Sequence, residues 1–288
     1  MESLADYLKS LYTPITAKAY IREINIFLAN FPEAKKAAYK DIVIYLGTIR
    51  KRYTNVKTIN RILASMKAYY EFLCHTGQRK DNPAKNIRLR DKQNRDIQLQ
   101  DLFAPEELET LLNREERFIK LSFRNKVLMS LLIYQALHPK ELEAITLNDI
   151  NLQQGTIYIK ATPRNNNREL SLKPSQIMLF YQYIFEARPR LLKGNQSDYL
   201  IIGERGNPMT AEDMTKHVKR TCKNRFISRN VNAQTIRQSV ITNLLKSGND
   251  LRIVQTFAGH KYPSSTEKYK QNDVESLKAA LNIYHPIR

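Results

Sequence analysis

Three residues near the C-terminal end are of the types that can break and remake a phosphodiester. Arg237 lies in QTIRQ, His260 ends FAGH, and Tyr269 ends TEKY nine residues after that histidine. An arginine clamps a phosphate through paired N–H donors, and a histidine donates to a phosphoryl oxygen or shuttles a proton. A tyrosine hydroxyl can attack phosphorus and become its covalent carrier. Such a reaction conserves the bond energy in the protein–DNA linkage, so it needs no metal or nucleotide cofactor.

Each of these residues also has an ordinary structural interpretation. An arginine on a helix is usually solvated, His260 could cap a helix after Ala258-Gly259, and Tyr269 could simply pack by its ring. With 16 tyrosines in 288 residues, one more is weak support by itself. The three positions therefore have to be judged with the elements that carry them.

Those elements are predicted to be helices joined to a small sheet. Apolar spacing and end signals predict helices over 233–247, 251–258 and 266–271. The segment GTIYIKATPRNNNRELSLK alternates on both sides of a turn rich in Asn and Pro, which predicts a β-hairpin. Further helices are predicted over 105–112, 123–135, 174–186, 211–223 and 274–282.

The N-terminal part predicts a separate helical domain. Helices are expected near 3–11, 16–29 and 39–51, and a longer one after Thr54 or Asn55 that ends at Gly77. The polar, aperiodic stretch that follows predicts a linker over 89–102. The chain is thus expected to be mainly α, with an N-terminal helical domain over 1–88 and a mainly helical domain with a small antiparallel β-sheet over 103–288.

The charge of the chain favours a nucleic-acid partner. Lys and Arg total 47 against 28 acidic residues, a net charge of +19, of which residues 1–88 carry +9. Excess positive charge attracts polyanions because phosphate contacts release counterions, and Lys57, Arg61 and Lys67 on the polar face of the long helix are candidate contacts. No segment is long and apolar enough to span a membrane, and two cysteines without metal spacing are typical of a reducing, cytoplasmic location.

At this point the sequence resembles the tyrosine recombinases of the phage integrase family, in its Xer-like branch. QTIRQ corresponds to the family's His-x-Leu-Arg-His, FAGH to its Leu-Gly-His, and TEKY to the segment ending in the tyrosine. ALHPKEL corresponds to Gly-Leu-Arg-x-Ser-Glu-Leu, and DNPAKNI and the closing HPIR resemble the end of the family's first domain and its C-terminus. The resemblance covers nearly the whole chain.

The departures from that pattern fall on catalytic positions. The family's first arginine becomes His138, its first histidine becomes Gln234, and the last residue of that box is Gln238. The family's hairpin lysine has no clear counterpart, and Lys160 and Arg164 are the possible substitutes. Because loss of one preorganised donor costs about 3–4 kcal/mol of transition-state stabilisation, roughly a hundred- to thousandfold in rate, we expect a slow or conditional enzyme.

The resemblance implies a site-specific recombinase that clamps duplex DNA between two domains, forms a 3′-phosphotyrosyl bond through Tyr269 and works as a homo-tetramer on two sites. The tail helix over 274–282 would then dock on a neighbouring protomer. Two alternatives stay open: a catalytically impaired DNA-binding accessory protein of the same fold, and a type IB topoisomerase, against which the Xer-like length and the HPIR ending argue.

Overall fold

A computed structural model describes residues 3–91, 101–113, 116, 118–223, 226 and 229–270. The chain separates into two compact units, Met1–Arg95 and Asp96–Arg288, which are described one at a time. The predicted linker over 89–102 and the predicted tail helix over 274–282 lie largely or wholly outside the described residues.

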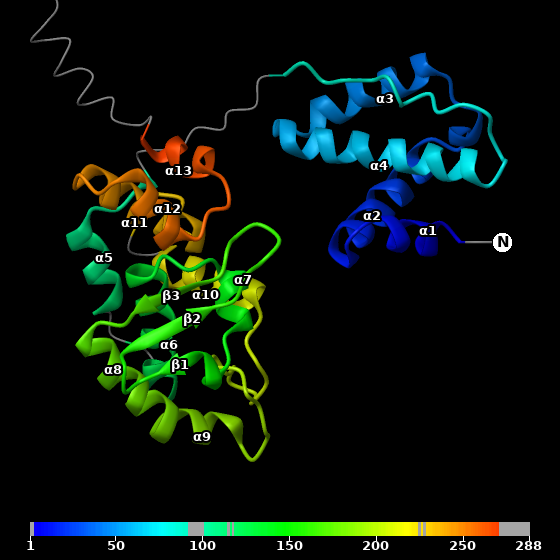
Figure 1. Cartoon of the computed structure of the whole chain (residues 1–288). Coiled ribbons are helices and arrows are strands. Elements are labelled where there is room, and N and C mark those ends of the chain that lie inside the picture. The colour runs from blue at the N-terminus through cyan, green and yellow to red at the C-terminus, as the bar shows by residue number, and fades with distance from the viewer. Residues whose placement is uncertain are drawn as a thin grey trace, which may run out of the picture. The chain divides into compact units, whose positions relative to one another are not determined.

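The first unit is a small helical bundle. Its helices are α1 (Leu4–Leu11), α2 (Pro14–Asn30), α3 (Tyr39–Arg52) and α4 (Val56–His75), with a short 3₁₀ turn at Ala34–Lys36 (Figure 1). The apolar spacing that predicted α4 is the face it buries, because Ile62, Met66, Tyr70 and Leu73 all enter the core. The Asn55 side chain accepts a hydrogen bond from the Lys57 amide and starts the helix.

The second unit packs helices around a three-stranded sheet. Its helices are α5 (Pro105–Leu112), α6 (Ile119–Tyr134), α7 (Pro139–Ala144), α8 (Pro174–Tyr181), α9 (Arg188–Leu192), α10 (Ala211–Lys223), α11 (Ala233–Lys246), α12 (Leu251–Ala258) and α13 (Pro263–Lys270). The antiparallel sheet has the order β1 (Ile150–Asn151), β2 (Thr156–Ile159) and β3 (Arg168–Ser171). In β2 and β3, Ile157 pairs with Leu170 and Ile159 with Arg168.

The core of this unit is built on α6, which lies in the middle of it. Val127, Leu128, Leu131 and Leu132 of α6 are fully buried among apolar side chains from the sheet and the surrounding helices. Figure 1 shows α11, α12 and α13 gathered at one end of the unit and α9 at the other. The end that holds α11 to α13 is therefore where Arg237, His260 and Tyr269 are brought together.

The predicted fold class is confirmed, with local differences in several elements. The predicted hairpin has a third strand, β1, which is only two residues long and has no detectable alternation. The helix predicted over 174–186 continues instead through a π-helical segment, Gln182–Ala187, into α9. The helix predicted to begin at residue 266 begins at Pro263, because proline suits the first turn of a helix.

Candidate active site

Arg237 projects from the first turns of α11 into the interior. The Asn232 side chain accepts hydrogen bonds from the amides of Gln234 and Thr235 and fixes where this helix starts. The register then puts Arg237 on the buried face, where it is 3% exposed. A buried guanidinium must find acceptors, because an unpaired buried charge is costly.

The acceptors of Arg237 come from three separate segments. Nη1 donates to the carbonyl of Ala136 at 2.5 Å and is 3.4 Å from Oε2 of Glu141, and Nη2 donates to the carbonyl of Ala258 at 2.6 Å. These contacts tie α11 to the loop after α6, to α7 and to the end of α12. Arg237 therefore holds the segment that precedes His260.

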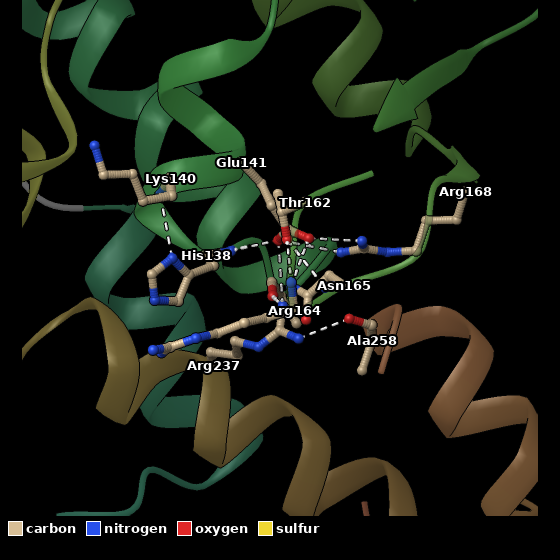
Figure 2. Close-up of polar contacts among 10 residues, drawn as sticks. His138, Lys140, Glu141, Thr162, Arg164, Asn165, Arg168, Arg237 and Ala258 are labelled. Carbon is tan, nitrogen blue, oxygen red and sulfur yellow. Dashed lines mark hydrogen bonds and ion pairs between the residues drawn. The ribbon is translucent and has the colours of Figure 1, made fainter. Parts of the chain in front are cut away.

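Glu141 accepts hydrogen bonds from several residues of the site (Figure 2). Its carboxylate faces Arg168 in a bidentate pair, with Nη1 to Oε1 at 2.8 Å and Nη2 to Oε2 at 3.3 Å. It also accepts from the Asn165 amide at 2.9 Å and from the His138 backbone amide at 2.8 Å. Burial alone would raise the pKa of Glu141, but the Arg168 and Arg237 guanidiniums outweigh it, and the pKa is lowered.

The buried cluster carries a net positive charge that can take a phosphate. One carboxylate, Glu141, stands against two guanidiniums, Arg168 and Arg237. The three contacts of Arg237 use three of the five N–H donors that a guanidinium has. Within the described residues the other two, Nε–H and one proton of Nη2, make no hydrogen bond. An anion is the partner that suits them.

His138 occupies the position of the missing family arginine and is held neutral. Its Nδ1 accepts a hydrogen bond from the Lys140 amide at 3.2 Å, which caps the N-terminus of α7 and requires an unprotonated Nδ1. Burial, followed by the charges of Arg237 and Arg164, lowers its pKa. His138 is therefore neutral in the free protein and offers a single donor, Nε2–H.

His260 and Tyr269 form a stacked pair beside this cluster. Their ring centroids are 6.1 Å apart with an interplanar angle of 15°, and Nδ1 of His260 is 2.8 Å from the buried hydroxyl of Thr266. Tyr269 is 9% exposed and packs with Ile241, Val254 and Ala258. The ring of Tyr269 therefore packs in the interior, and it does so beside His260, so its role as a nucleophile stays a prediction.

The charged cluster affects the pKa values of both His260 and Tyr269. Burial lowers the pKa of His260 to about 4, with Arg237 and Arg168 adding to the effect, so the imidazole is neutral at pH 7. Burial raises the pKa of the Tyr269 hydroxyl, and Arg237 opposes that rise. A neutral imidazole next to a protonated phenol is the state from which a base can take the phenolic proton.

The pKa of His260 makes stability depend on pH. In the unfolded chain the imidazole binds a proton near pH 6.5, whereas in the native chain it does so only near 4. The unfolded state therefore binds more protons between these values, and the free energy of unfolding must fall as the pH drops through this window. We expect the melting temperature to fall steadily from pH 6.5 towards pH 4.5 and to fall less steeply in His260→Asn. An unchanged slope in that variant would contradict the assignment.

Gly259 connects α12 to His260 and has no room for a side chain. Its φ is +70°, and an added Cβ would collide with Nη1 of Arg168. Left-handed backbone costs a residue with a Cβ about 1–2 kcal/mol. We expect Gly259→Ala to lose this amount of stability and also to displace Arg168, and so to reduce the DNA cleavage that the resemblance implies. Gly248→Ala is the matched control, because Gly248 has φ +85° and open space around it. Equal cleavage by the two variants would show that the contact with Arg168 has no catalytic consequence.

The two substitutes considered for the hairpin lysine lie in different surroundings. Nζ of Lys160 is 2.9 Å from Asp149, so its charge is engaged by a half-exposed ion pair. Arg164 lies in the loop between β2 and β3, is exposed, and acts electrostatically on His138. Figure 2 shows its side chain extending towards His138 and Arg237.

The remaining predicted residues are more peripheral. The Gln234 side chain is exposed on the first turn of α11, and Gln238 is half-buried one turn later. In the first unit Lys57 is exposed and Lys67 half-buried. Arg61 is 2.9 Å from Glu23, a carboxylate that is 5% exposed.

Sequence reasoning assigned no role to Glu141, Arg168 or Asn165. A signal for Arg168 was present, because the alternation of RELSL places it on the same face as Leu170 and Leu172, where a charge needs a buried partner. Glu141 was quoted within ALHPKEL but without a function. Asn165 gave no signal beyond its membership of a polar turn.

The described parts of the chain contain neither a candidate metal site nor a membrane-spanning helix. No group of three or more His, Cys, Asp or Glu side chains there is arranged to hold a metal ion. No helix among those residues is long and apolar enough to cross a bilayer.

Both units match sequence models of known protein families. The sequence model of the phage integrase family matches residues 102–276. That of the phage integrase N-terminal SAM-like domain matches residues 2–77. A tyrosine recombinase XerD of Oceanobacillus iheyensis is 28% identical over 278 residues, covering 94% of this chain and 92% of that protein.

Solved structures share the fold. XerH recombinase bound to a palindromic difH substrate, in a post-cleavage complex, has a TM-score of 0.74 at 21% identity, over 94% of this chain and 80% of that one. A lambda integrase dimer bound to a COC′ core site has a TM-score of 0.69 at 14% identity, over 93% of this chain and 75% of that one.

Proposed function

Because this chain belongs to the phage integrase family, we propose that it is a site-specific DNA recombinase that cuts and rejoins duplex DNA through Tyr269. The observation that carries the proposal is the meeting of Arg237, His260 and Tyr269 at one net-positive cluster. The guanidinium has donors left for a phosphate, the imidazole is neutral, and the phenol is stacked beside it.

The cleavage step follows from these groups. The Tyr269 oxygen forms a bond to the scissile phosphorus, and the bond from phosphorus to the 5′ oxygen breaks. The phenolic proton passes to Nε2 of His260 when Nδ1–H donates to Thr266, and the 5′ oxygen leaves as a hydroxyl with a proton from water. Arg237 neutralises the charge that grows on the non-bridging oxygens. A 5′ hydroxyl from a second strand then attacks the 3′-phosphotyrosyl bond and frees Tyr269.

The two units would bind DNA together. Residues 1–88 form a core-binding domain in this proposal, the segment 89–102 a linker, and residues 103–288 the catalytic domain with its tail. Lys57, Arg61 and Lys67 provide phosphate contacts of the first domain, which makes binding depend steeply on salt. For Arg61 this requires that phosphate compete with Glu23.

The complete reaction needs four protomers on two DNA sites, because each of four strands has to be cut once. The tail predicted to be helical over 274–282 has apolar positions that suit docking on a neighbour. The proposal places the protein in the cytoplasm, where its DNA substrate would lie.

The test is a nicked duplex whose cleavage releases a short fragment and so traps the covalent state. We expect an SDS-resistant protein–DNA adduct, and mass spectrometry of the digested adduct should map the nucleotide to the peptide that contains Tyr269. Mapping on a fragmented genomic library would also give the target sequence. A protein that binds this DNA specifically but gives no adduct would be the accessory protein instead, an alternative supported by the neutral His138 and the buried Tyr269.

Replacing His138 with arginine should raise the rate of adduct formation. The change restores a fixed positive charge where the family pattern has one. One such donor is typically worth a hundred- to thousandfold. Because Arg164 already brings a positive charge to this side of the site, we expect only part of that gain, at least about tenfold. Arginine cannot accept the cap from the Lys140 amide, so stability should fall by about 1 kcal/mol. Single-turnover rates on the nicked duplex measure the gain, and an unchanged or lower rate would contradict it.

A further inference from the structure

We propose that Arg164 supplies the second guanidinium of this active site and so takes the role of the arginine that is missing at position 138. This inference rests on the proposed function and deepens it. It assigns Arg164 to the non-bridging oxygens of the scissile phosphate, and not to the departing 5′ oxygen that the family's hairpin lysine serves.

The site has a vacancy for a positive charge next to His138. The imidazole caps α7 through Nδ1 and is neutral, so it presents one uncharged donor. Arg168 cannot fill the vacancy, because it is 7% exposed and both its terminal nitrogens are bound to Glu141. Arg168 keeps a buried Nε without a hydrogen-bond partner, but the two terminal nitrogens with which it could hold a phosphate are engaged by Glu141, whereas Arg237 retains Nε–H and one proton of Nη2.

Arg164 approaches this vacancy from the hairpin loop. Its charge acts on His138 alongside that of Arg237, and its side chain points towards both of them (Figure 2). Within the described residues the Arg164 guanidinium makes no hydrogen bond or ion pair. Among the described residues its N–H donors are therefore unpaired, and they lie on the side of the site where the family pattern has arginine.

The loop that carries Arg164 is fixed to the catalytic cluster on both sides. Asn165 donates from its side chain to Glu141 at 2.9 Å, and the Asn166 amide donates to the carbonyl of Gly259 at 2.8 Å. Within the loop, the Thr162 hydroxyl accepts from the amides of Arg164 and Asn165. The residue next to Arg164 thus touches the same carboxylate that orients Arg237, which places the two arginines in one frame.

The chemistry of arginine agrees with this role. A guanidinium stays protonated in proteins, so it stabilises growing negative charge but does not deliver a proton to a leaving oxygen. If arginine is lost at position 138 and gained at position 164, the phosphate still meets the same number of guanidiniums as in the family pattern. It leaves the proton of the 5′ oxygen to come from water.

Two chemically altered DNA strands separate the roles. A methylphosphonate at the scissile position replaces one charged non-bridging oxygen with a methyl group, so the residue that neutralises this oxygen is no longer needed. A 5′-bridging sulfur at the same position leaves as a thiolate, so a residue that protonates the leaving atom is no longer needed. Single-turnover adduct formation by the full chain is measured on both strands and on ordinary DNA.

We expect Arg164→Ala to slow adduct formation on ordinary DNA about a hundredfold, in the range found for one lost electrostatic donor. The methylphosphonate should shrink this defect to less than about fivefold, whereas the 5′-sulfur strand should keep it about a hundredfold. The rate of Arg164→Lys, which keeps the charge but not the planar set of N–H donors, should lie between those of the wild type and Arg164→Ala. In His138→Arg, adding Arg164→Ala should cost less than about tenfold, because the arginine at 138 replaces the lost donor.

Arg190→Ala is the matched control, because Arg190 is an exposed arginine on α9 at the opposite end of the unit from α13 (Figure 1). Its rates should equal those of the wild type on all three strands. The inference is overturned if Arg164→Ala behaves like this control, or if the 5′-sulfur strand restores Arg164→Ala and the methylphosphonate does not. If the wild type forms no Tyr269 adduct on any strand, the proposed function itself fails, and this inference with it.

Discussion

Tyr269→Phe is expected to form no covalent adduct with DNA and to melt at nearly the same temperature as the wild type. The ring supplies the packing of this residue, since it stacks on His260 and is buried against Ile241, Val254 and Ala258. In the described part of the chain the hydroxyl makes no hydrogen bond, and its burial raises its pKa. Phenylalanine keeps the ring and removes only the oxygen that attacks phosphorus.

This variant separates catalysis from folding and from DNA binding. The measurements are adduct formation on the nicked duplex, affinity for the same duplex at fixed salt, and thermal unfolding. Tyr262→Phe is the control, because Tyr262 lies in the same segment and is 69% exposed. An adduct that survives in Tyr269→Phe and is lost in Tyr262→Phe would transfer the role to Tyr262.

Arg237→Lys is expected to slow cleavage by about a hundred- to thousandfold while the protein stays folded. Lysine keeps a positive charge beside Glu141, and Arg168 still pairs with that carboxylate, so no buried charge is left alone. An ammonium on a single stem cannot reproduce the contacts with Ala136 and Ala258 and also present two donors to a phosphate. The loss should therefore appear in the rate more than in stability.

Arg237→Met tests how much the charge and the hydrogen bonds of Arg237 contribute to stability. It removes the charge as well as the hydrogen bonds, leaves the carbonyls of Ala136 and Ala258 without their donor, and should lower stability by about 1–3 kcal/mol. Rates are compared at equal folded fraction, with Arg190→Lys as the control for an exposed arginine. Cleavage by Arg237→Lys at the wild-type rate would show that Arg237 is a purely structural residue.

Much of the secondary structure follows from local signals in the sequence. The helix predicted over 211–223 coincides with α10, and the one over 251–258 coincides with α12. Both have clear ends, since Glu212 and Asp213 lie in the first turn of α10 and Asp250 caps α12. Where local signals are weak, as in the two-residue β1 or the π-helical turn after Tyr181, prediction failed because neighbours decide the conformation.

The residues of the candidate site also fall into two groups, those that the sequence singled out and those that it did not. Arg237, His260 and Tyr269 were singled out by their chemical types and by the resemblance of QTIRQ, FAGH and TEKY to the family's motifs. Glu141 and Arg168 lie 27 residues apart and act only when β3 and α7 are brought together. No local pattern specifies that their charges meet inside the protein.

The sequence by itself determined which side chains can do chemistry, the helices that carry them, and the basic charge that attracts DNA. Only the tertiary structure decided that His138 is neutral, since that depends on a cap to the Lys140 amide and on the nearby charges of Arg237 and Arg164. It also distinguished Lys160, engaged by Asp149, from Arg164, whose guanidinium is free within the described residues. The physical reason is that protonation and ion pairing depend on distance in space and on burial, which are properties of the folded chain.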